Sequence, residues 1–126
     1  MASAYVRTTV KGWAASAPLP FFDTVSLEQD PADDAWFSVD WTFADRERLT
    51  FCDEHAEIGT FNIVCFFRPG VGDDIAATQA EAVTAALMAM VDPSGSLTLT
   101  NHGTPEDYLE DAWYVLSTTV NYRANG

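Results

Sequence analysis

Basic residues are scarce in this chain. Its 126 residues include six lysines and arginines against nineteen aspartates and glutamates, which gives a formal net charge of −13. Proteins bind duplex DNA largely by neutralising phosphates with Lys and Arg, so a surface that grips DNA is strongly disfavoured. Binding to an anionic membrane surface is disfavoured for the same reason. No apolar run approaches the roughly 20 residues of a membrane-spanning helix, and residues 1–20 lack the apolar stretch of a secretory signal.

Cysteine is almost as rare. Cys52 and Cys65 are too few for a disulfide framework, so we expect two reduced thiols in a cytosolic protein. Cys52 precedes Asp53 and Glu54, whose negative charges disfavour the thiolate that a nucleophile needs. The length, with 48% apolar residues, fits one domain that spans residues 1–126 and builds its own hydrophobic core.

Hydrophobic periodicity predicts both helices and strands. Val6, Val10 and Trp13 recur at helical spacing and predict a short N-terminal helix. Residues 36–43 alternate between two faces, with aromatic and β-branched side chains on one, which is typical of a half-buried strand. Further strands are expected at 21–27, 49–52, 57–68, 96–101 and 112–123, and 104–111 is expected to be a loop or a frayed strand end.

A second helix is predicted after the turn at 69–72, with Asp73 or Asp74 as its N-cap. Ile75, Gln79, Val83, Leu87 and Met90 follow one helical stripe, which we expect to be its buried face. The expected fold class is therefore α+β: an antiparallel β-sheet with one long helix packed on a face and a short N-terminal helix.

The predicted strand at 57–68 carries apolar residues on both of its faces. Its odd-numbered positions from 61 to 67 form one apolar face, and Val64 and Phe66 lie on the other. Because a strand is apolar on both faces only when both are covered, we expect a buried helix or a partner subunit to cover the second face. Met88 lies off the helical stripe and is a further candidate for such a contact.

Arg46 and Arg48 are two of the six cations and stand in an acidic stretch that we expect to protrude. An arginine there can pair bidentately with a carboxylate of a neighbouring chain. Local pairing with nearby acids is the alternative, and surface pairs of that kind contribute about 0–1 kcal/mol. The full set of candidate partner-interface residues is Arg46, Arg48, Leu49, Phe51, Val64, Phe66 and Met88.

No constellation in the sequence predicts catalysis. His55 and His102 stand near loop residues, without the spacing of a metal site or a nucleophile–base arrangement. Gly70 and Gly72 precede a helix but lack the third glycine and the lysine of a phosphate loop, and the acids that follow them would repel a phosphate. The acidic pairs do not follow the spacing of a calcium loop. We therefore expect no catalytic residue, no metal site and no cofactor.

Several segments between residues 34 and 123 resemble the tail terminator proteins of long-tailed bacteriophages and of related prophage or gene-transfer particles. These segments are AWFSV at 35–39, GTFNIV at 59–64, PGVG at 69–72 before an alanine-rich helix, AWYV at 112–115 and NYR at 121–123. The resemblance implies a structural virion protein that forms a homo-hexameric ring. Such a ring caps the tail tube protein, ends its polymerisation and offers its other face to neck or head-tail connector proteins.

In that family DNA passes through the ring without specific binding, and an acidic wall suits such a passage because it repels phosphates. Three alternatives stay open at this point: another neck or connector component, a small acidic α+β ligand-binding or enzyme domain with a pocket under the helix, and a mimic of DNA. The acids are scattered over loops rather than aligned along one helix face, which argues against the mimic.

Overall fold

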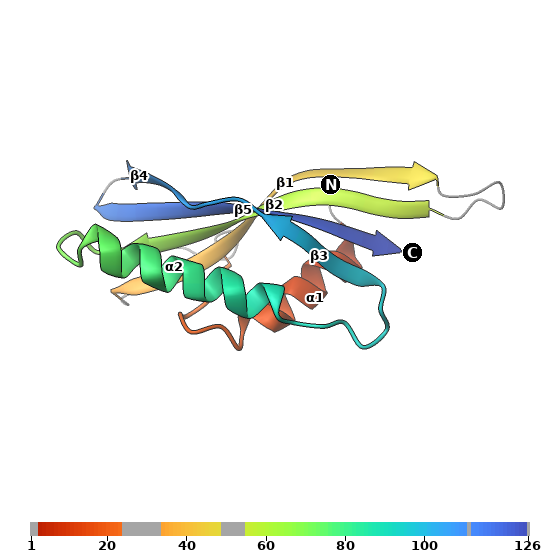
Figure 1. The fold of residues 1–126 in the computed structure, drawn as a ribbon, viewed down its shortest axis with the longest axis horizontal. Coiled ribbons are helices and arrows are strands. Elements are labelled where there is room, and N and C mark those ends of the chain that lie inside the picture. Colours follow the sequence, from red (N-terminus) through yellow and green to blue (C-terminus); the bar gives the residue numbers. More distant parts are fainter. Residues whose placement is uncertain (1–2, 24–33, 49–54, 111, 126) are drawn as a thin grey trace.

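A computed structural model describes residues 3–23, 34–48, 55–110 and 112–125 of the chain. The elements follow the order α1 (Ala4–Ala14), β1 (Ala35–Arg48), β2 (His55–Phe67), α2 (Asp73–Met88), β3 (Leu97–His102), β4 (Glu106–Glu110) and β5 (Trp113–Asn125). The fold is α+β, with one antiparallel sheet and two helices of 11 and 16 residues that lie on the same side of it (Figure 1).

The sheet has the strand order β1-β2-β5-β3, and β4 also pairs with β5. β3 pairs with the second half of β5 and β4 pairs with its first half, so the two short strands together form one broken edge. At the break, the Gly103 N–H donates to the Thr119 carbonyl over 2.9 Å, which continues the ladder. The sheet is therefore four strands wide along its length.

The main core lies between the sheet and the two helices. α1 buries Val6, Val10 and Trp13, as its spacing predicts, and Ser3 caps its start by accepting a hydrogen bond from the Val6 N–H. The largest fully buried side chains include Phe37, Phe61, Ile63, Phe67, Leu87 and Tyr122. Cys65 belongs to this core, and burial raises the pKa of its thiol to about 12, so the thiol stays protonated at neutral pH.

The start and the buried face of α2 differ from the sequence prediction. Gly72, with φ of 97°, occupies the N-cap position instead of Asp73 or Asp74, which stand in the first turn and favour the helix dipole there. Ile75, the first residue of the predicted stripe, is 51% exposed. The buried residues are Ala76, Ala80, Val83, Thr84 and Leu87. Small side chains on this face let the helix approach the sheet closely.

The opposite face of the sheet carries a second apolar cluster, here called the aromatic cluster. It consists of Phe22, Trp36, Val64, Phe66, Trp113 and Val115. Trp36 stacks on Phe66 with ring centroids 4.1 Å apart and meets Trp113 edge-to-face at 5.9 Å. Side chains of the chain itself thus cover the second face of β2 at Val64, which is 9% exposed.

Most strand predictions agree with the structure in position but not in extent. β1 is longer than the predicted 36–43, β2 lies close to the predicted 57–68, and the segment at 104–111 contains the strand β4. Of the strand expected at 21–27, the described part forms a single parallel bridge between Phe21 and Phe37. The strand expected at 49–52 lies outside the described residues. Among the described residues, no helix is long and apolar enough to cross a membrane.

Asp92 ties the loop after α2 to both α1 and β3. Its carboxylate accepts hydrogen bonds from the Tyr5 hydroxyl, from the N–H and hydroxyl of Ser94, and from the Leu97 N–H at 3.0 Å. The Tyr5 bond is the largest cause that lowers the pKa of Asp92 from 3.8 to about 2. A depressed folded-state pKa means that the charged carboxylate stabilises the fold above about pH 4, and that this contribution is lost as the pH falls toward 2.

Replacing Asp92 with asparagine is therefore expected to lower stability at pH 7 and to flatten the loss of stability between pH 4 and pH 2. Urea unfolding followed at several pH values measures both effects. Glu81→Gln is the matched control, because Glu81 is exposed and makes no hydrogen bond or ion pair with another described residue. A D92N protein whose stability falls with pH as steeply as that of the wild type would contradict this role for Asp92.

Candidate interaction surface

β4 is an edge strand with its side chains in solvent. All five of its residues are exposed, and it includes two large apolar side chains, Tyr108 at 45% and Leu109 at 76% exposure. In the described part of the chain its one strand neighbour is β5. An edge strand of this kind presents unpaired backbone N–H and C=O groups, which another strand can pair with.

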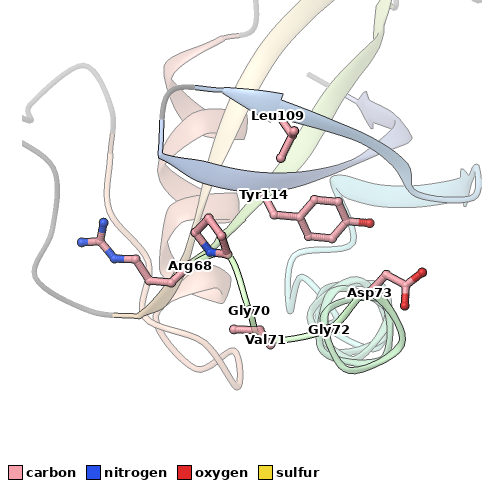
Figure 2. A pocket seen from close by; sticks show the side chains of 8 residues that line it. Arg68, Gly70, Val71, Gly72, Asp73, Leu109 and Tyr114 are labelled. Carbon is pink, nitrogen blue, oxygen red and sulfur yellow. The ribbon is translucent and has the colours of Figure 1, made fainter.

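A hollow of about 390 Å³ lies beside β4 on the face that bears the helices. Leu109 and Tyr114 of the sheet line it, and so does the turn from Arg68 to Asp73. Gly70 and Gly72 both have positive φ in this turn, which lets the chain pass directly from β2 into α2. Figure 2 shows the Tyr114 ring directed toward the first turn of α2, where Asp73 lies, and the Arg68 guanidinium directed away from both.

Asp73 lines this hollow, and Asp107 lies beside it. The Tyr114 hydroxyl donates to the Asp107 carboxylate over 3.0 Å. Burial, then this hydrogen bond, then the charges of Asp107 and Asp73 raise the pKa of Tyr114, so its hydroxyl remains protonated. Arg68, the one nearby cation, lies over the Trp113 ring at 3.8 Å from its centroid. The hollow therefore combines apolar walls with an excess of negative charge.

The negative charge extends over the whole of this end of the sheet. Its exposed acids are Asp34, Asp73, Asp74, Glu106, Asp107 and Glu110. None of them forms an ion pair with another described residue. Between described residues the one ion pair joins Lys11 and Asp23 at 2.6 Å, in a different part of the fold. These six carboxylates are thus available to a cationic partner.

Of the seven candidate interface residues, the structure describes the side chains of three: Val64, Phe66 and Met88. Arg46 and Arg48 stand in β1 opposite Glu57 and His55, and their side chains lie outside the described part of the structure. Leu49 and Phe51 also lie outside the described residues. Val64 and Phe66 belong to the aromatic cluster, whereas Met88 packs against the main core on the other face.

Tyr108, Leu109 and Tyr114, which shape the surface at β4, are absent from the sequence-based candidates. The alternation in β4 covers five residues and is dominated by acids, so the sequence pattern favoured a loop. A weak signal was present, because Tyr108 and Leu109 are large apolar residues within an otherwise acidic stretch.

Among the histidines and cysteines of the chain, the structure describes the side chains of His102 and Cys65. His102 is exposed, and its Nδ1 lies 2.8 Å from the Gly103 carbonyl oxygen. The side chain of His55 and all of Cys52 lie outside the description. Within the described ranges, no three His, Cys, Asp or Glu side chains are grouped so that they could hold a metal ion.

No protein-family model matches the chain, and no curated protein matches it significantly.

Proposed function

We propose that this chain is a structural virion protein that assembles as a hexameric ring on the end of a tail tube. In this role the ring stops addition of tube subunits and presents its other face to neck or head-tail connector proteins. The resemblance of residues 34–123 to tail terminators supports the proposal. The structural observation that carries it is the exposed edge strand β4, with Leu109 76% exposed beside the hollow.

A ring requires each copy to contact its neighbours through two different surfaces. The sheet offers two such surfaces, because β1 lies at one edge and the broken strand β3–β4 at the other. The charge also suits the role. Six copies of a chain with a net charge of −13 carry −78, so a ring with part of this charge on its wall repels DNA phosphates that pass through it.

A neck or connector component is a closely related alternative, since it also forms a ring about the DNA path. A small ligand-binding domain is a different one, and a second hollow favours it. This hollow, of about 260 Å³, lies under α2 at the break between β3 and β4, and its lining includes Glu81, Thr84, His102 and Thr118. A ligand-binding domain of this kind is expected to work as a monomer.

The mass of the purified chain in solution separates these functions. Six chains of 13.8 kDa give about 83 kDa, which is the mass that the ring predicts in mass photometry or sedimentation. The measurement should be made over a range of protein concentrations, because ring assembly depends on concentration. A mass of 13.8 kDa throughout that range would favour the ligand-binding domain.

A further inference from the structure

The two edges of the sheet run in opposite directions. The sheet is four strands wide and each strand is antiparallel to the next, so β4 runs opposite to β1. A second copy in the same orientation therefore presents its β1 antiparallel to β4 of the first. Pairing of these edges continues the antiparallel sheet from copy to copy without inverting any copy, and a rotation between copies closes such a series into a ring.

Both edges have an open stretch, and the two stretches lie at opposite ends of the sheet. On the outer side of β1, the segment at 20–22 pairs with Phe37 through bonds of 2.9 and 3.0 Å. Beyond that bridge, residues 39–48 pair with β2 on their inner side, and no other strand of the described chain pairs with their outer side. β4 is open at the other end, beside the start of β5 (Figure 1). A second copy that pairs this part of its β1 with β4 of the first copy is therefore shifted, relative to the first copy, along the direction of the strands.

Register places opposite charges of the two edges on the same face. Directly paired positions of neighbouring strands share a face of the sheet. Position 46 pairs with Glu57, which accepts a hydrogen bond from the Tyr122 hydroxyl in the main core. Asp107 pairs with Leu116, which also belongs to that core. Positions 46 and 48 of β1 and position 107 of β4 therefore all lie on the face that bears the helices.

The acidic hollow lies on that same face, next to β4. Its apolar walls, Leu109 and Tyr114, suit the aliphatic stem of an arginine. The carboxylate of Asp73 in the lining, and that of Asp107 bonded to the Tyr114 hydroxyl, suit its guanidinium. On the opposite face both edges carry acids, Glu106 and Glu110 on β4 and positions 45 and 47 on β1. Electrostatic attraction between the edges is therefore confined to the face with the hollow.

We propose that β4 of one copy pairs with the open stretch of β1 of the next copy. Arg46 and Arg48 of that second copy then bind at the hollow lined by Asp73, Leu109 and Tyr114, and at Asp107 beside it. This contact rests on the proposed ring and specifies how the ring is joined. It assigns the partner of the acidic hollow as a second copy of this chain rather than a tube or neck protein.

Two complementary variants test the contact. The first, Asp73→Lys/Asp107→Lys, reverses the charge at the hollow, and the second, Arg46→Glu/Arg48→Glu, reverses it on β1. Each variant alone is expected to lose the assembled mass of about 83 kDa and to sediment at 13.8 kDa. Mixed in equal amounts they are expected to recover the assembled mass, because each reversed surface then meets a reversed surface on the other variant and each native surface meets a native one.

The control is Asp74→Lys/Glu81→Lys, which makes the same change in charge on exposed positions of α2 that do not line the hollow. It is expected to assemble normally, and circular dichroism verifies that every variant is folded.

If the wild type assembles and both test variants assemble equally well, the proposed contact is wrong although the ring is retained. If the hollow variant fails but the β1 variant assembles, the hollow binds a different cation. If the two variants stay monomeric when mixed, the edges do not meet as proposed. A monomeric wild type would instead reject the ring itself.

Discussion

Alanine in place of Trp36 is expected to lower the free energy of unfolding by about 3–5 kcal/mol, the usual cost of removing a large buried aromatic side chain. Trp36 is 2% exposed and holds the aromatic cluster together. It stacks on Phe66 and meets Phe22 and Trp113 edge-to-face. Urea denaturation monitored by circular dichroism measures the change.

Phenylalanine at position 36 is the informative control. The Trp36 Nε1 is buried and has no hydrogen-bond acceptor among the described residues. An unpaired buried donor costs about 1–3 kcal/mol, and Trp36→Phe removes that donor while keeping an aromatic ring in the stack. We expect W36F to lose less than about half of what W36A loses. Equal losses in the two variants would contradict this explanation.

The aromatic cluster also connects stability to the proposed function. Trp113 and Val115 belong to the part of β5 that pairs with β4, opposite Glu110 and Tyr108. Loosening of the cluster should therefore loosen the edge strand that we propose as the contact between copies. The W36A variant is expected to assemble poorly under conditions where it is still folded.

Strong periodicity made several elements predictable from the sequence. The alternation in β1 and the spacing of Val6, Val10 and Trp13 in α1 predicted correctly where both elements lie. The prediction of a half-buried β1 was wrong, because Trp36 on one face and Phe37 on the other are both buried. The face of α2 was not predictable in the same way. Its buried face is mostly alanine and threonine, which carry little hydrophobic signal, so the larger Ile75 was wrongly assigned to the stripe.

The second face of β2 shows where sequence reasoning lacked tertiary information. The apolar residues Val64 and Phe66 correctly indicated a covered face. Trp36 and Trp113 cover this face, and they belong to β1 and β5, the strands on either side of β2. A local sequence pattern cannot indicate this contact, because the residues that form it are far apart along the chain.

The hollow beside β4 depends on tertiary structure in the same way. Leu109 and Tyr114 belong to neighbouring strands, whereas Asp73 belongs to α2. No local spacing connects the helix with the strands. In contrast, the scarcity of cations and the acidic stretch around them singled out Arg46 and Arg48 as candidates for a contact with another chain.

If the chain caps a tail tube as proposed, its removal is expected to change both the length and the joining of tails. A tube that nothing caps continues to add subunits, so tails are expected to outgrow their normal length. Without the surface that the ring presents, the tubes are also expected to remain separate from heads. Supplying the wild-type chain in trans should restore both properties, whereas the Asp73→Lys/Asp107→Lys variant should restore neither.

The tail-length distribution in electron micrographs of particles assembled without this chain tests the proposed function most directly. If this chain ends tube growth, the distribution is broad and extends well beyond the normal length, with few tails joined to heads. Tails of normal length joined to heads would contradict the assignment as a tail terminator.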